Sequence, residues 1–247
     1  MNETLYGRRS VLEALRAGRR RTWRLFVAEG AQTRGTLSEI IEIARQRGLS
    51  IQTVRRAELE RVVGNDHHQG VALEASAYPY ADLDEALAAG QARGEPPFLL
   101  MLDHVQDPQN LGTLLRTAEA VGVHCVILPE RRAAGVTPAV SNASAGAVEH
   151  LAVAQVTNLA QTIEALKRQG VWVAGLQPAP KAIPYDQADL RGALALVVGS
   201  EGEGLSALVQ ERCDWLLMLP MRGRIASLNA AVAGSIVLYA AWRARSS

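Results

Sequence analysis

Two spacings of apolar residues alternate along this chain, and together they predict its secondary structure. Short apolar runs, many of them rich in β-branched residues, predict buried strands at 98–102, 125–128, 151–156, 171–174, 194–198 and 215–218. Stretches with helical spacing separate most of these runs, which predicts a parallel sheet with helices on both faces. Residues 228–245 are rich in alanine and predict a final helix. Its small residues suit either a dimer interface or ordinary core packing.

The first 75 residues predict a separate, smaller α/β domain. Strand and helix patterns alternate at 11–17, 25–28, 37–47, 51–54, 57–63 and 71–75. Thr36 and Glu39 have the spacing of a capping box at the start of the second helix, and Gly48 follows its end. A proline-containing stretch with one short helical pattern comes next. We therefore predict an N-terminal domain at 1–76, a linker at 77–96 and a C-terminal domain at 97–247.

Composition narrows the class of protein. The chain has 247 residues, of which 48% are hydrophobic, which is enough for a sizeable core. No apolar run approaches the roughly 18 residues of a membrane span, and the first residues lack the apolar core of a signal peptide. Cys125 and Cys213 lie far apart without metal-ligand spacing. We expect a cytoplasmic protein with no metal site and no disulfide framework.

The net charge of +1 conceals an uneven distribution. Residues 1–61 contain 13 arginines and 7 acidic residues, whereas acidic residues are in excess over the rest of the chain. Only Lys167 and Lys181 are lysines. Arginine suits bidentate phosphate recognition, but a GC-rich genome gives the same bias.

Three polar loops follow predicted strands and are the candidate functional segments. They span 103–112, 199–204 and 219–229. Ligands of open α/β sheets bind beyond the carboxyl ends of the strands, so we expect these loops to converge on one pocket.

The loop at 199–204 indicates what kind of ligand that pocket holds. Its glycines follow a GxxGxG pattern instead of the dinucleotide-binding GxGxxG, and Glu201 and Glu203 oppose a phosphate. This disfavours a nucleotide-dependent oxidoreductase, and no GxxxxGK[ST] loop is present. A phosphate-free, positively charged cofactor fits better. The alternative is that both glutamates only favour the dipole of a following helix.

The three loops resemble the three sequence motifs of the SpoU branch of the SPOUT RNA methyltransferases, both in their residues and in their order along the chain. The resemblance extends over residues 96–247. The resemblance implies S-adenosyl-L-methionine as cofactor and a ribose 2′-hydroxyl of RNA as acceptor, with a guanosine of 23S rRNA favoured. It also implies a homodimer, a deep trefoil knot in the C-terminal α/β domain and an N-terminal RNA-substrate-binding domain. Two alternatives stay open: a tRNA ribose 2′-O-methyltransferase, and an RNA-binding protein with a cofactor pocket but little catalysis.

The same resemblance assigns roles to individual residues. Its active-site positions fall on Asn110, Arg116, Glu201 and Asn229, and its cofactor-binding positions on Gly199, Leu219, Pro220, Met221, Ser227 and Leu228. Arg116 is the proton-removing agent that the family implies. A guanidinium stays protonated in proteins, so holding a phosphate or polarising the hydroxyl is an equally open role.

Two positions depart from the family pattern. The third motif continues with Ala230 and Ala231, where relatives usually have a second serine. Loss of that hydroxyl predicts reduced activity unless Ser227 or water replaces it. Near the start, Gly7 is followed by Arg8 and Arg9 where Gly-x-His is common, which predicts a small difference in RNA contacts.

The N-terminal arginines are the candidate RNA contacts. They are Arg8, Arg9, Arg19, Arg20, Arg21 and Arg24. Trp23 lies among them, and base stacking on aromatic rings favours binding of looped RNA. A solvated basic loop with Trp23 in the core explains the same pattern.

His67 and His68 predict a structural turn, and Asp103 and His104 predict a cap at a strand–helix turn.

Overall fold

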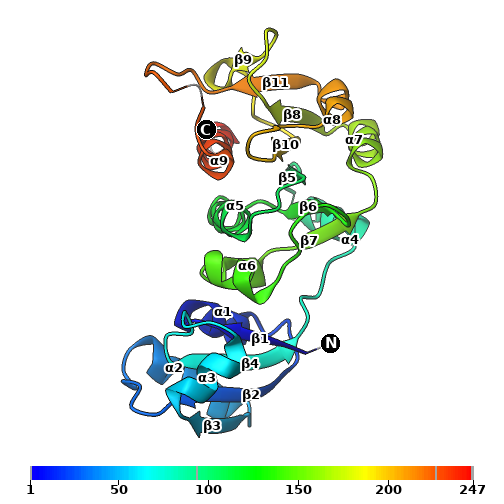
Figure 1. Cartoon of the computed structure of the whole chain (residues 1–247). Coiled ribbons are helices and arrows are strands. Elements are labelled where there is room, and N and C mark those ends of the chain that lie inside the picture. The colour runs from blue at the N-terminus through cyan, green and yellow to red at the C-terminus, as the bar shows by residue number, and fades with distance from the viewer. Residues whose placement is uncertain (1, 93, 226, 246–247) are drawn as a thin grey trace. The chain divides into compact units, whose positions relative to one another are not determined.

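A computed structural model describes residues 2–92, 94–225 and 227–245, which form two compact units (Figure 1). The first unit comprises the described residues up to Pro79 together with Val136–His150. The second comprises Tyr80–Gly135 and the described residues from Leu151 onward. The sequence-based boundaries place Val136–His150 in the C-terminal domain, so the chain returns to its first unit at a point that the pattern did not indicate.

The first unit contains a four-stranded sheet in the order β1-β4-β2-β3. The strands are β1 (Asn2–Tyr6), β2 (Thr22–Ala28), β3 (Ser50–Val54) and β4 (Val71–Ser76), and the helices are α1 (Arg8–Ala17), α2 (Thr36–Gln46), α3 (Arg56–Val63) and α6 (Pro138–Ala143), with the 3-10 helix η1 (Ala147–His150). β4 is antiparallel to both of its neighbours, and β2 and β3 are parallel. Alternate strand residues supply two cores, one on each face of the sheet.

The start of α2 differs from the prediction. Thr36 is the first helical residue and Gly35 is the N-cap, which has no side-chain hydrogen bond. The capping box predicted from Thr36 and Glu39 is therefore wrong, because capping requires the hydroxyl to lie one residue before the helix.

The second unit is built on a seven-stranded sheet in the order β7-β6-β5-β10-β8-β11-β9, in which every pairing is parallel. The strands are β5 (Phe98–Asp103), β6 (Cys125–Pro129), β7 (Val153–Val156), β8 (Trp172–Leu176), β9 (Ile183–Pro184), β10 (Leu194–Gly199) and β11 (Trp215–Met218). The helices are α4 (Leu83–Gln91), α5 (Pro108–Ala120), α7 (Leu159–Arg168), α8 (Ala207–Arg212) and α9 (Ala230–Arg245), with the 3-10 helix η2 (Tyr185–Gln187). The predicted parallel sheet with helices on both faces is confirmed.

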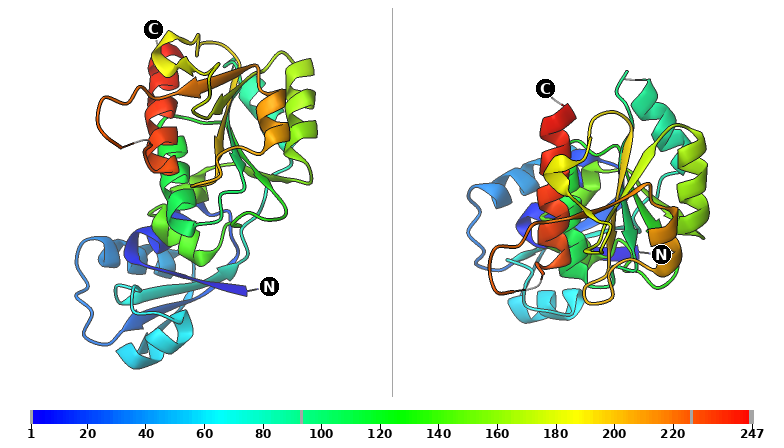
Figure 2. Two further views of the ribbon diagram at one scale, coloured as in Figure 1. Left: turned by 45° about the horizontal axis from the view of Figure 1, so that its top comes forward. Right: turned by 90° about the horizontal axis from the view of Figure 1, so that it is seen from above.

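Helices α5 and α9 lie side by side on one face of this sheet, and α4, α7 and α8 lie on the other (Figures 1 and 2). Thr117 of α5 and Ser235 of α9 join the two helices through hydroxyls 2.8 Å apart. A Cβ at Gly234 would lie 2.7 Å from Leu114 and 3.0 Å from Val198. The small residue thus allows α9 to approach both α5 and the sheet.

Register places two of the polar loops side by side. Leu194 to Gly199 of β10 pair in order with Phe98 to Asp103 of β5, so the two strands end level. β11 ends at the same edge, because parallel strands point in one direction. Within the described part of the chain, no helix is long and apolar enough to cross a membrane.

Candidate active site

Two residues act as caps that fix the side chains of the site at the starts of α5 and α9. Asp107 accepts a hydrogen bond from the backbone N–H of Asn110 at 2.9 Å, and Pro108 occupies the first turn of α5. Asn229 caps the start of α9, where its Oδ1 accepts hydrogen bonds from the backbone N–H groups of Ala231 at 2.9 Å and Val232 at 3.2 Å. Its amide nitrogen is thereby turned toward the other loops. The predicted last helix consequently starts at Ala230.

Asn110, Glu201 and Asn229 form one hydrogen-bonded cluster, which we call the amide–carboxylate cluster. Asn110 Nδ2 donates to Glu201 Oε2 at 2.9 Å. Asn229 Nδ2 donates to Asn110 Oδ1 at 2.8 Å and lies 3.2 Å from the same carboxylate oxygen of Glu201. The three loops therefore converge through three of the four predicted catalytic residues.

Glycines make the tight loop that carries Glu201 possible. A Cβ at Gly199 would lie 2.2 Å from the backbone of Gly204, and Ser200 and Gly204 exchange backbone hydrogen bonds across the loop. Gly204 has φ 72°, and a Cβ there would lie 2.0 Å from Gln177 Oε1. That oxygen accepts the N–H of Leu205 at 3.0 Å. Gln177 supports the loop, and no motif in the sequence singled it out.

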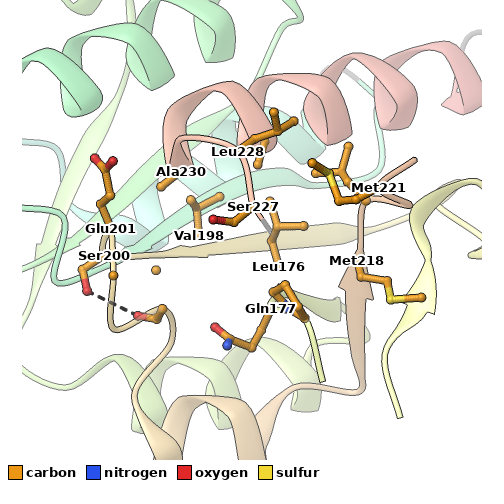
Figure 3. A pocket seen from close by; sticks show the side chains of 16 residues that line it. Leu176, Gln177, Val198, Ser200, Glu201, Met218, Met221, Ser227, Leu228 and Ala230 are labelled. Atoms are coloured by element: carbon orange, nitrogen blue, oxygen red, sulfur yellow. Dashed lines mark hydrogen bonds between the residues drawn. The ribbon is translucent and has the colours of Figure 1, made fainter. Parts of the chain in front are cut away.

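A cavity of about 290 Å³, the cofactor cavity, lies beside this loop (Figure 3). Five of the six predicted cofactor-binding residues line it, namely Gly199, Leu219, Met221, Ser227 and Leu228; Pro220 is not among the lining residues. Leu176, Val198 and Met218 add apolar walls, while Gln177, Ser200 and Glu201 provide polar groups. Among the described residues that line it, none is a lysine or an arginine, and the only charged side chain is a carboxylate. These walls suit a partly apolar ligand that carries positive charge, and they disfavour a phosphate.

A second cavity of about 650 Å³, the polar cavity, adjoins the first. The two share Ser200, Glu201, Gly204 and Ala230 as lining residues. His104, Asn110, Arg132 and Glu203 face the polar cavity alone. The carboxylate of Glu201 thus stands at the junction, next to the amide of Asn110.

Arg116 does not join the amide–carboxylate cluster. It is exposed on α5 and lines neither cavity. Within the described residues it has no hydrogen bond and no ion pair. Asn110 and Arg116 lie six residues apart on one helix, which directs them about 120° away from each other.

The six predicted RNA-contact arginines of the first unit differ in exposure. Arg9, Arg19, Arg21 and Arg24 are exposed, as is Trp23, which is not in the core. Arg8 is partly buried, and its Nε donates to the carbonyl of Gln69 at 3.1 Å. Gln69 Oε1 accepts the N–H of Arg8 at 2.9 Å, which gives α1 a cap from a distant loop.

Arg20 is buried and belongs to an internal ionic network. Its Nε and Nη2 donate to the two carboxylate oxygens of Glu149 at 2.9 and 3.0 Å, and Nη1 donates to Glu3 at 2.7 Å. Burial works to lower the pKa of Arg20, but the carboxylates of Glu149 and Glu3 raise it above its usual value. Glu149 also accepts from Ser141, whose hydroxyl lies 2.7 Å from that of Ser10. This geometry does not support RNA contact by Arg20.

The two cysteines are thiols with raised pKa values. Cys125 and Cys213 are free thiols, and burial raises the pKa of each to about 12, so neither is a nucleophile at neutral pH. Within the described residues, no three His, Cys, Asp or Glu side chains are grouped to hold a metal ion.

The site consists of a cofactor cavity at the strand ends, an adjoining polar cavity and the amide–carboxylate cluster between them. This arrangement is typical of an α/β enzyme that brings a small cofactor next to a larger polar substrate. Residues 97–239 match the SpoU rRNA methylase family, and residues 4–81 match the domain described as RNA 2′-O ribose methyltransferase substrate binding. The chain belongs to the SpoU methylase family. It is an S-adenosylmethionine-dependent RNA 2′-O-ribose methyltransferase.

Relatives extend the similarity over the whole chain. A putative TrmH family tRNA/rRNA methyltransferase of Bacillus subtilis, YacO, is 43% identical over 244 residues, covering 99% of this chain and 96% of its own. A solved RNA 2′-O ribose methyltransferase is 25% identical with a TM-score of 0.78, covering 98% of this chain and 88% of its own. The SpoU methyltransferase AviRb of Streptomyces viridochromogenes is 22% identical with a TM-score of 0.80 over 98% and 90% of the two chains, which shows the shared fold.

Proposed function

We propose that this enzyme methylates a guanosine ribose of large-subunit ribosomal RNA, and that the amide–carboxylate cluster marks the place of transfer. The observation that carries the proposal is that Glu201 lines both cavities and accepts a hydrogen bond from Asn110, which lines the polar cavity. The cofactor cavity holds the methyl donor and the polar cavity receives the acceptor ribose. The proposal includes a trefoil knot in the second unit and a cytoplasmic location, both as expected from the sequence.

The side chains of the site have distinct tasks in this proposal. Bound S-adenosylmethionine supplies a methyl group on a positively charged sulfur. The Glu201 carboxylate favours positive charge at the junction, and Asn110 and Asn229 hold that carboxylate in one orientation. The loop backbone at Gly199, Leu219 and Leu228 provides cofactor contacts. Rate enhancement comes mainly from aligning donor and acceptor.

Arg116 contributes to transfer in this proposal only through a second copy of the chain. Arg116 lines neither cavity of its own chain. Helix α9 exposes Val232, Tyr239 and Trp242, which are 46%, 48% and 43% accessible, although α9 is otherwise packed on α5 and the sheet. We expect a homodimer to cover this apolar face and to bring Arg116 to its partner's polar cavity.

The exposed arginines of the first unit provide the RNA-contact surface. Arg9, Arg21 and Arg24 can contact phosphates, and Trp23, at 39% exposure, can stack on an unpaired base. The match of residues 4–81 to a substrate-binding domain supports this role.

Transfer of tritiated methyl groups tests the proposal. The protein is incubated with labelled S-adenosylmethionine and in-vitro-transcribed large-subunit ribosomal RNA, and the label is mapped by nuclease digestion and mass spectrometry. We expect label on the 2′-oxygen of one guanosine. Label on a base, or on the ribose of a different nucleotide, would contradict the proposal.

Transfer RNA is the second candidate substrate. A solved structure described as giving insights into the 2-OH methylation of C/U34 on tRNA is 30% identical with a TM-score of 0.54, over 60% of this chain and 96% of its own. That match covers only 60% of this chain, and the ribosomal target stays first because the matching family is described as rRNA methylases. A transfer RNA pool in the same assay decides between the two.

A binding protein with little catalysis is the third candidate, and it depends on Ala231. Ala231 is only 1% exposed, and its N–H is bonded to Asn229. The amide–carboxylate cluster forms without a hydroxyl at this position, which favours catalysis. RNA binding without any methyl transfer would favour the binding protein.

A further inference from the structure

His104 combines an unfavourable backbone conformation with a buried charged partner. Its φ is 59°, in the left-handed region that only a few per cent of residues other than glycine adopt, although histidine is one of the residue types enriched there. The preceding residue, Asp103, is fully buried at the end of β5. Asp103 Oδ1 lies 2.5 Å from His104 Nδ1, and Asp103 Oδ2 accepts the N–H of Ser206 at 2.7 Å. The carboxylate thus fixes both the loop after β10 and the imidazole ring.

This partner determines which ring nitrogen carries the proton. A carboxylate only accepts hydrogen bonds, so Nδ1 of His104 is the protonated nitrogen. In the neutral ring, Nε2 then keeps its lone pair. The side chain is 37% exposed and lines the polar cavity. His104 therefore offers a fixed hydrogen-bond acceptor to whatever enters this cavity.

The Nε2 acceptor of His104 shares the polar cavity with several charged side chains. Besides Asp103, the charged groups there are Asp107, Glu201, Glu203 and Arg132. Arg132 is the only cation among the described residues that line the cavity. Ribose hydroxyls and base amino groups are the donors that RNA supplies.

We propose that His104, oriented by Asp103, contacts the acceptor nucleotide and accepts a hydrogen bond from one of its hydroxyl or amino groups through Nε2. The proposal rests on the polar cavity being the place where the acceptor ribose binds. Two observations support the contact: Asp103 holds the ring in one orientation, and the ring is exposed in the lining of the polar cavity.

His104→Asn is the variant that isolates the ring. Asparagine tolerates the left-handed conformation, and its amide can still donate to Asp103, but it lacks a fixed acceptor at the position of Nε2. His67→Asn is the matched control, because His67 has a 76% exposed side chain and lines neither cavity. Thermal unfolding of both variants checks that the fold is kept.

Steady-state methylation of in-vitro-transcribed large-subunit ribosomal RNA gives the first readout. We expect His104→Asn to raise KM for RNA about tenfold, the loss of one substrate hydrogen bond, with kcat within about twofold of wild type. An unchanged KM would overturn the contact, and so would a collapse of kcat at unchanged KM. If the wild-type protein methylates neither this RNA nor transfer RNA, the proposed function fails instead.

The ring nitrogens of His104 give a second readout that needs no turnover. Long-range ¹H–¹⁵N spectra of the free protein at pH 8 report which nitrogen is protonated, and the His104→Asn spectrum assigns the signal. We expect the Nδ1-protonated form, with a shift of the Nε2 resonance when the RNA is added. An Nε2-protonated ring, or no shift on saturation with RNA, would overturn the proposal.

Discussion

Two polar networks in this protein join residues from distant parts of the chain, and they differ mainly in burial. In the amide–carboxylate cluster, Asn110 meets Asn229 across 119 positions, and both donate to or lie beside Glu201, which lines the two cavities. In the ionic network of the first unit, Arg20 meets Glu149 across 129 positions, and both side chains are almost completely buried. The first network can meet a substrate, whereas the second can meet only the protein.

The comparison shows how burial changes the contribution of a polar network to stability. A buried ion pair must satisfy both charges internally, because an unpaired charge away from water is very unfavourable. The partly exposed cluster has water as an alternative partner, so breaking it affects orientation more than stability. We therefore expect changes in the ionic network to alter unfolding and changes in the cluster to alter methyl transfer.

The largest effect on stability should follow from Arg20→Ala. Removal of the guanidinium leaves Glu149 buried without its main partner, which we expect to lower the free energy of unfolding by about 3–5 kcal/mol. Urea unfolding measures the change. Arg21→Ala is the control, because Arg21 is exposed beside it. Equal effects of the two substitutions would show that burial is not the deciding difference.

The next largest effect should be a loss of catalytic rate in the Asn110→Ala variant. This change removes the hydrogen bonds of Asn110 to Glu201 and Asn229, and we expect kcat to fall about 100-fold while the unfolding midpoint changes little. Gln109→Ala is the control, since Gln109 is exposed and lines neither cavity. Wild-type turnover in Asn110→Ala would remove the cluster from the site of transfer.

Alkaline pH should weaken the first unit through Tyr78. Burial raises the pKa of Tyr78 to about 12, although the guanidinium of Arg19 opposes the shift. The unfolded chain loses this proton near pH 10, so stability is intact below pH 10 and is lost as pH rises to about 12, by about 2 kcal/mol. Burial raises the pKa of Cys125 and Cys213 in the same direction.

Tyr78→Phe separates the contribution of Tyr78 from that of the thiols. Unfolding free energies of wild type and variant, measured at several values between pH 9 and pH 12, should converge as the pH rises. Parallel curves would mean that Tyr78 does not titrate differently in the folded protein.

The smallest effect should come from an exposed arginine of the first unit. Arg21→Ala removes one phosphate contact, so the slope of log affinity against log salt should become shallower by about 0.7–0.9. Fluorescence anisotropy with labelled RNA at several salt concentrations measures it. A slope identical to that of wild type would place the RNA on another face.

The sequence predicted those features that depend on local pattern. Apolar runs located the parallel strands, and the rule for strand ends placed the loops of Glu201 and Asn229 at one pocket. The motif resemblance selected Asn110 for the same place. Each of these inferences uses residues within one short segment, together with the known direction of parallel strands.

The features that escaped prediction depend on contacts between distant segments. Arg20 looked identical to its neighbours Arg19 and Arg21, because its partner Glu149 lies in a segment assigned to the other domain. The positive φ of His104 could be predicted only weakly, because histidine is enriched in this conformation without being confined to it. Arg116 was grouped with Asn110 by motif, but helical geometry turns the two side chains apart.

One measurement tests the central claim, that the amide–carboxylate cluster is where a methyl group reaches an RNA ribose. Wild type and Asn110→Ala are incubated under single-turnover conditions with tritiated S-adenosylmethionine and unmodified large-subunit ribosomal RNA, and the labelled position is mapped. The account predicts label on one ribose 2′-oxygen with wild type and a rate about 100-fold lower with the variant. Equal rates, or label on a base, would contradict it.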